Sequence, residues 1–112
     1  MESNIIKERS IKTIDPNSDV RVRLVGLVES YDDKIGTFEI SDKIKKLTCL
    51  PPLNPGYKPE KGAFVTVVGR IVPADNNEIE LRTESIEKIS EKEYDYYNKY
   101  LNIRGDLLNN GS

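Results

Sequence analysis

The amino-acid sequence predicts an all-β protein, a small five-stranded barrel followed by a C-terminal α-helix. Three observations lead to this prediction: five runs rich in β-branched and aliphatic residues, turn-forming segments between them, and one amphipathic helical pattern after the last run. The 112 residues fit a single domain, because chains divide into several domains only at greater lengths. We therefore expect the barrel to occupy residues 20–89.

An N-terminal arm and a turn, residues 1–19, precede the barrel. The arm, residues 1–14, contains isoleucines that could form an edge strand or pack across one end of a barrel. Asp15 and Pro16 then open a polar turn, since this pair followed by Asn, Ser and Asp disfavours both helix and strand. The first barrel strand is therefore expected to begin at residue 20.

The first and fourth predicted strands, residues 20–31 and 63–72, each contain a glycine within an aliphatic run, Gly26 and Gly69. Glycine weakens the interior of a strand because it has no side chain to pack. Small barrels, however, need sharp bends where one strand serves two parts of the sheet, and glycines supply them. We interpret both glycines as such bends. The alternative is two unrelated glycines in ordinary antiparallel strands.

The other predicted strands are residues 36–41, 46–50 and 78–89, in which apolar and polar side chains alternate over at least part of the run. Residues 51–62 contain four prolines and two glycines, which exclude a strand or a helix of any length. A tight loop, residues 73–77, precedes the last strand. The short connections and the lack of an internal helical pattern favour a closed or nearly closed barrel.

A helix is predicted over residues 90–104, and residues 105–112 are predicted to form a flexible tail. Ser90 and Glu93 have the spacing of a capping box, and Gly105 is expected to end the helix. At about 100° per residue, one half of the helical wheel is aromatic or apolar. A face this wide favours contacts with both the barrel and a partner, and the alternative is a helix that only closes the barrel. The residues of this half are Tyr94, Tyr96, Tyr97, Tyr100, Leu101 and Ile103.

The residue types limit the chemistry that the chain can perform. It has no histidine and a single cysteine, Cys49. A Cys/His zinc set and a Ser–His or Cys–His nucleophile pair are therefore excluded, and no glycine-rich phosphate loop occurs. We expect a protein that is not an enzyme and that uses no metal and no cofactor. No apolar run reaches the length of a signal-peptide core or a membrane span, so we expect a cytoplasmic location, nucleoid-associated in an archaeon and nuclear in a eukaryote.

The net charge of −2 is unevenly distributed along the chain. Residues 20–73 carry 9 basic and 6 acidic side chains, whereas residues 74–112 carry 5 basic and 9 acidic ones. The middle of the chain is therefore mildly basic and its C-terminal third is acidic, which is compatible with a binding surface on one side of the molecule.

The stretches DVRVRLVGLVES, GTFEIS, KGAFVTVVGRIV and EIELRTESIEKIS together resemble an OB-fold of the nucleic-acid-binding kind. Their order is similar to that in small subunits of replication protein A and in related telomere-capping subunits, and the resemblance covers residues 11–104. In those proteins a C-terminal helix follows the OB barrel and assembles the complex. The resemblance therefore implies other OB-fold subunits as partners. The composition, rich in Ile, Lys, Glu and Tyr without His or Trp, is similar to that of archaeal thermophiles.

OB-folds bind oligonucleotides across their second and third strands and the adjoining loops, and binders of single strands combine cationic with aromatic side chains. The loop at residues 73–77 is acidic and lacks an aromatic residue, and the chain has no tryptophan. We therefore expect weak direct binding. Phe38 could instead belong to the core, and Lys45 and Lys46 could form a solvated turn. The candidate nucleic-acid-binding residues are Tyr31, Lys34, Phe38, Lys43, Lys45, Lys46 and Arg70.

The resemblance and the residues together predict an OB-fold subunit of a replication-protein-A-like complex that binds single-stranded DNA in replication or repair. The candidate partner-binding residues lie on the predicted helix: Tyr94, Tyr97, Tyr100 and Leu101. Two alternatives remain at the level of the sequence. One is a purely structural OB-fold subunit of a polymerase or RNA polymerase assembly, without nucleic-acid contact. The other is an OB domain that binds RNA or tRNA.

Overall fold

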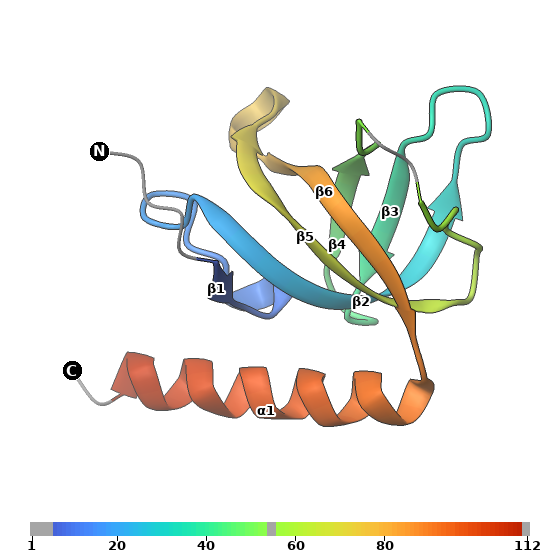
Figure 1. Cartoon of the computed structure of the whole chain (residues 1–112). Helices are drawn as coiled ribbons and strands as arrows, with labels where there is room; N and C mark the ends of the chain where they lie inside the picture. Colours follow the sequence, from blue (N-terminus) through green and yellow to red (C-terminus); the bar gives the residue numbers. More distant parts are fainter. Residues whose placement is uncertain (1–5, 54–55, 111–112) are drawn as a thin grey trace.

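The computed structural model describes residues 6–53 and 56–110, and for residues 102–110 it describes the backbone alone. Its main elements are a curved sheet and one long helix that lies along the outside of that sheet (Figure 1). The elements are β1 (Lys7–Glu8), the 3-10 helix η1 (Ile11–Thr13), β2 (Arg21–Tyr31), β3 (Phe38–Ser41), β4 (Lys46–Leu50), β5 (Phe64–Pro73), the 3-10 helix η2 (Asp75–Asn77), β6 (Ile79–Ile89) and α1 (Glu91–Asn110).

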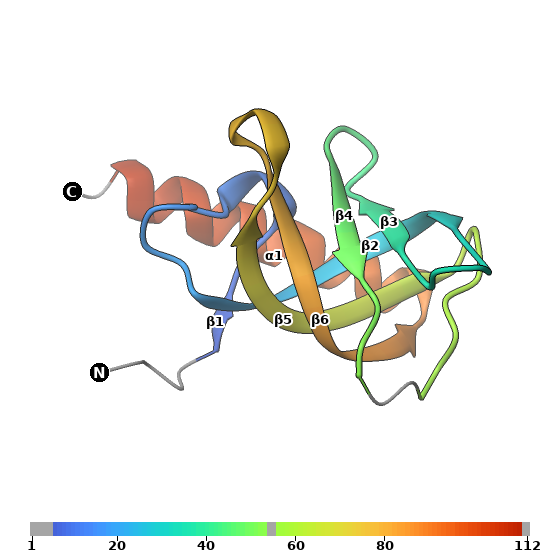
Figure 2. The ribbon, with the colours of Figure 1, turned by 90° about the horizontal axis from the view of Figure 1, so that it is seen from above.

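Strands β2 to β6 close into a barrel (Figure 2). The strand order is β1-β2-β3-β4-β6-β5, and β5 pairs back onto β2. Neighbouring strands of the barrel are antiparallel except β4 and β6, which run parallel. The predicted five-stranded barrel with a C-terminal helix is confirmed, and the short β1 adds a parallel edge to β2.

Strand β2 serves both halves of the barrel. Its residues 21–27 pair with β5, and residues 27–31 pair with β3. Its inward side chains, Val22, Leu24 and Val28, are fully buried in the barrel core. Val25 points outward and is also buried, because α1 covers it. The doubly apolar part of the strand thus has one face in the barrel and the other under the helix.

Gly26 and Gly69 occupy inward positions where no side chain fits. A Cβ on Gly26 would lie 2.9 Å from the Cβ of Ile40 on β3. A Cβ on Gly69 would collide with the carbonyl oxygen of Arg82 and lie 2.9 Å from Leu81 Cγ. The β5–β6 register also shifts between Val68 and Gly69, as expected of a bulge that bends a barrel strand. Both glycines therefore permit close approach of neighbouring strands.

The N-terminal arm combines the two expected roles. Lys7 and Glu8 form the edge strand β1, and Ile11 is 2% exposed within the barrel core cluster. A buried carboxylate fastens the arm, because Asp19 accepts hydrogen bonds from Arg9 Nε at 3.0 Å and from the Asp15 amide at 2.9 Å. The arm is thus part of the folded domain.

The helix begins as predicted and ends later than predicted. The Glu93 amide donates to Ser90 Oγ at 3.1 Å, and the Ser90 amide donates to Glu93 Oε1 at 3.1 Å, which completes a capping box. The predicted end at Gly105 is wrong, since α1 continues to Asn110. A glycine in a helix interior costs about 1 kcal/mol, which weakens a helix without ending it. The predicted tail is therefore helical over residues 105–110, and residues 111–112 lie outside the described part.

Within the described residues, no helix is long and apolar enough to cross a membrane.

Candidate nucleic-acid and partner interfaces

The outer face of β3 and β4 is the surface on which OB-folds bind oligonucleotides. Because side chains alternate along a strand, the buried residues of these strands leave Glu39 and Thr48 pointing outward. These two residues are directly opposite each other, and Thr48 is also opposite Glu80 on β6. At the centre of this face, Thr48 therefore has one carboxylate on each side. These negative charges disfavour binding of a polyanion such as DNA there.

At one end of this face, the β2–β3 loop contains a hollow of about 530 Å³ that brings Tyr31 and Lys34 together. Lys58 lies over the ring of Tyr31, with Nζ 5.3 Å from its centroid, and 3.0 Å from Asp33 Oδ1. The hydrogen bond to Asp33 raises the pKa of Lys58. A base that stacks on Tyr31 would have to displace this ammonium group.

The β3–β4 turn lies at the opposite end, with Lys45 and Lys46 exposed. Asp42 Oδ1 shapes this turn by accepting hydrogen bonds from the amides of Ile44 at 2.9 Å and Lys45 at 2.7 Å. The two lysines border a groove of about 290 Å³ that also includes the β5–β6 loop. This end is the more accessible cationic part of the face.

Lys43 points away from both lysines. Its ammonium lies 5.7 Å from the ring centroid of Tyr94 and 5.9 Å from that of Phe64, within the range of cation–π attraction. The backbone of Lys43 has a φ of 76°, which turns its side chain toward the junction of barrel and helix. Lys43 therefore does not share a surface with the other predicted nucleic-acid-binding residues.

Arg70 lies on a third region, the outer face of β2, β5 and β6. It is directly opposite Arg21 on β2 and Arg82 on β6. The carboxylate of Glu84 bridges Arg21 at 2.7 Å and Arg70 at 3.7 Å. Arg70 therefore belongs to a charge network on the side of the barrel away from the β3–β4 pair.

Phe38 is 1% exposed and lies in the barrel core cluster. Phe38 points inward, in phase with Ile40, so the alternative that it belongs to the core is confirmed and it is not available to stack on a base. The seven predicted residues thus fall into separate places: Tyr31 and Lys34 share one hollow, Lys45 and Lys46 share the turn, and the rest lie elsewhere. No single basic, aromatic surface results among the described residues.

The tyrosines of α1 divide into two sets. Tyr94 is 2% exposed and packs on Phe64 with ring centroids 4.8 Å apart, and Leu101 is 6% exposed. Burial, together with the nearby carboxylate of Asp42, raises the pKa of Tyr94. The prediction that Tyr94 and Leu101 bind a partner is wrong for this conformation, since they attach the helix to the barrel.

The exposed set is Tyr96, Tyr97 and Tyr100, which are 68%, 44% and 47% exposed. Of these three, Tyr97 lies nearest the barrel. Tyr96 and Tyr97 contact each other edge to face, with centroids 5.5 Å apart. Tyr96 was not among the predicted partner-binding residues, although the helical wheel places it in the aromatic half. The wheel could not indicate which edge of that half would meet the barrel.

The remaining chemistry is sparse in the described part of the chain. Cys49 is buried, and burial raises the pKa of its thiol, so it is a poor nucleophile. Among the described residues, no group of His, Cys, Asp and Glu side chains could hold a metal ion.

A closed barrel of five strands in this order, continued by a C-terminal helix, makes the chain an OB-fold protein. No protein-family model matches the chain, and no curated protein matches its sequence. Solved structures do match it. A chain of the S. pombe Stn1–Ten1 complex has a TM-score of 0.67 at 20% identity, over 94% of this chain and 96% of that one.

Two further structures match over nearly their whole length. The telomere capping protein Ten1 from S. pombe has a TM-score of 0.68 at 21% identity, over 91% of this chain and 99% of that one. A chain of a replication protein A heterotrimer bound to single-stranded DNA has a TM-score of 0.70 at 10% identity, over 94% and 98%. The resemblance to OB-fold subunits of telomere-capping and replication-protein-A complexes is confirmed at the level of the fold.

Proposed function

We propose that this chain is an OB-fold subunit of a replication-protein-A-like complex that binds single-stranded DNA, and that it assembles with other OB-fold subunits through the outward face of α1. The observation that carries the proposal is the row of exposed tyrosines on a helix that is already attached to the barrel. Tyrosine is enriched at interfaces because it buries a large area while its hydroxyl stays hydrated. The chain would act by binding, without catalysis.

The similar structures support this proposal because some of them are subunits of larger complexes. Two of the three are chains of complexes, one of Stn1 with Ten1 and one a replication protein A heterotrimer bound to single-stranded DNA. The helix lies on the surface of its own barrel (Figure 1). Its exposed tyrosines suit the same kind of assembly. Nucleic-acid contact is the lesser part of the proposal, contributed by Lys34, Lys45 and Lys46.

The test is purification of the tagged full chain from its native host, followed by mass spectrometry of the proteins that accompany it. The wild type should retain OB-fold partners, and the double variant Tyr96→Glu, Tyr100→Glu should lose them while remaining folded by circular dichroism. Asp95→Lys is the matched control, because Asp95 is exposed on the same helix outside the tyrosine set. Partners retained by the double variant would refute the proposed assembly face.

A structural subunit of a polymerase assembly is the second candidate. The carboxylates of Glu39 and Glu80, which flank the centre of the oligonucleotide-binding face, favour it over a strong nucleic-acid binder. The same purification separates the two candidates, since recovery of polymerase subunits would support the second. Preference for structured RNA over oligo-dT in a competition assay would instead favour an RNA-binding domain.

A further inference from the structure

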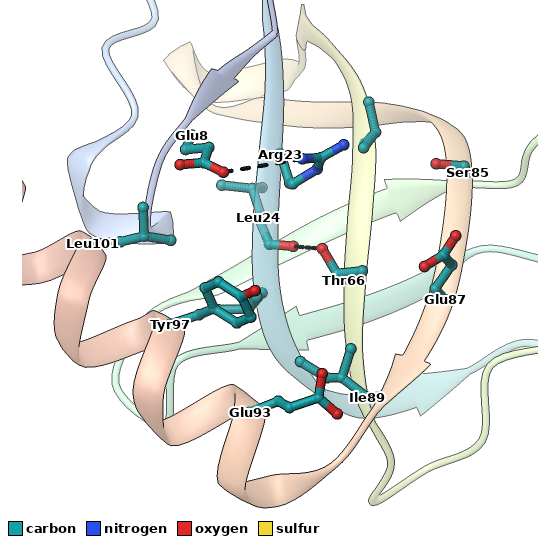
Figure 3. A pocket seen from close by; sticks show the side chains of 12 residues that line it. Glu8, Arg23, Leu24, Thr66, Ser85, Glu87, Ile89, Glu93, Tyr97 and Leu101 are labelled. Carbon is teal, nitrogen blue, oxygen red and sulfur yellow. Dashed lines mark hydrogen bonds and ion pairs between the residues drawn. The ribbon is translucent and has the colours of Figure 1, made fainter.

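A groove of about 330 Å³ runs between α1 and the outer face of the barrel (Figure 3). It exists because α1 packs against β2 and β5, while the outward side chains of Ser85 and Glu87 on β6 remain exposed. Its volume lies at the lower end of the range for ligand sites. A groove of this size suits a short chain segment.

The floor of this groove is apolar. Val25 and Val68 are 4% and 8% exposed and come from neighbouring strands, with Leu101 of the helix beside them at 6%. Tyr97 forms part of the helical wall and projects toward the groove (Figure 3). A ligand that reaches the floor would therefore contact the small apolar surface that these residues leave exposed.

The rim of the groove is acidic. Glu8, Glu87 and Glu93 line it, and among the described lining residues Arg23 is the one cation. Glu8 lies 4.0 Å from the Arg23 guanidinium, so this pair is largely neutral. Glu93 and Glu87 then make the other end of the rim negative among the described lining residues, and Glu93 Oε1 accepts a hydrogen bond from the Ser90 amide. Such a rim repels phosphate groups and attracts cations.

We propose that this groove binds an extended segment of a partner subunit in which lysine or arginine alternates with small aliphatic residues. In an extended chain, alternate side chains point to opposite sides. The aliphatic ones would contact Val25 and Val68, and the basic ones would reach Glu87 and Glu93. That the segment comes from a partner subunit rests on the proposed function. The kind of segment that binds follows from the groove itself.

The experiment measures fluorescence anisotropy of a labelled heptapeptide of alternating lysine and valine, titrated with the full-length chain at low salt. Saturable binding is expected, and a peptide of alternating glutamate and valine should not bind.

Glu87→Lys should weaken binding about fivefold or more, because it replaces an attractive charge pair with a repulsive one. Glu91→Lys is the matched control, since Glu91 lies in the first turn of α1 outside the groove lining. Ser85→Trp should also weaken binding, by filling the groove from an exposed position.

Equal effects of Glu87→Lys and Glu91→Lys would overturn the inference, because binding would then reflect net charge alone. Equal binding of both peptides, or of neither, would overturn it as well. The two proposals fail separately. Loss of peptide binding by Glu87→Lys, with partners still retained by the Tyr96→Glu, Tyr100→Glu variant, supports the groove and refutes the assembly face. Unchanged peptide binding by Glu87→Lys, with partners lost by the Tyr96→Glu, Tyr100→Glu variant, refutes the groove and leaves the assembly face supported.

Discussion

The two sides of α1 use the same residue type for different purposes. Tyr94 faces the barrel, is 2% exposed and packs on Phe64, whereas Tyr96 faces outward and is 68% exposed. The barrel side of the molecule is filled to the point that Gly26 and Gly69 leave no room for a methyl group. The surface, by contrast, carries exposed tyrosines on α1 and exposed lysines on the β3–β4 turn. Substitutions on the barrel side should therefore change stability, and those on the outward side should change binding.

The largest expected effect is that of Tyr94→Ala. Removing a buried aromatic ring typically costs about 3–5 kcal/mol of stability, and this ring joins helix to barrel. Tyr96→Ala should change the free energy of unfolding by less than about 0.5 kcal/mol. Urea denaturation of both variants measures the contrast, and equal losses would mean that the helix is not held through its barrel side.

Gly69→Val should destabilise the barrel by about 1–3 kcal/mol or more, because its Cβ would collide with the backbone of β6. The effect opposes the usual preference of strands for valine. Gly56→Ala is the control, since a Cβ there would meet nothing within 4 Å. Thermal denaturation compares the melting temperatures of the two variants with that of the wild type. A Gly69→Val variant more stable than the wild type would refute the close approach of β5 and β6.

A third prediction concerns alkaline pH. Burial raises the pKa of Tyr94 above its ordinary value of 10.0, so above pH 10 the unfolded chain loses this proton before the folded one does. The folded state then binds more protons, and stability falls as pH rises. Tyr94→Phe should reduce this loss. It should be neutral or slightly stabilising at pH 7, because the buried hydroxyl has no hydrogen-bond partner among the described residues. An unchanged slope of unfolding free energy against pH above 10 in Tyr94→Phe would contradict the prediction.

The smallest expected effect concerns DNA binding at the β3–β4 turn. Lys45→Gln with Lys46→Gln should lower the slope of log affinity for oligo-dT against log salt by about 1.4, since each phosphate contact with a single strand contributes roughly 0.7. Stability should stay the same. The double change Lys61→Gln, Lys88→Gln serves as the control, because these exposed lysines lie on other parts of the barrel. A slope that does not change would remove these lysines from the proposed interface.

Much of the fold could be predicted from local pattern. The strand at residues 46–50 and the capping box of Ser90 and Glu93 were placed correctly. Both depend on side-chain alternation or on a fixed spacing along the chain. Gly26 and Gly69 were also identified as special positions and interpreted as bends of the barrel strands. The structure adds that neighbouring strands approach both glycines closely.

The candidate surfaces were predicted less well. Arg70 and Lys45 were predicted to share one surface, yet Arg70 lies on the outer face of β5 and Lys45 lies in the β3–β4 turn. A residue's place around a closed barrel depends on the register of every strand between it and its neighbours. The sequence carries no direct signal for that register, so it could not bring the right cations together.

The sequence by itself determined the element types, the bends and the chemistry that the chain lacks, because those follow from residue type and spacing over a few positions. Only the tertiary structure decided which edge of the helix meets the barrel. It thereby placed Tyr94 and Leu101 inside, left Tyr96 and Tyr100 outside, and created the acidic groove beside Tyr97. The physical reason is that a helical wheel fixes angles between side chains, whereas the docking of the helix on β2 and β5 fixes which angle points inward.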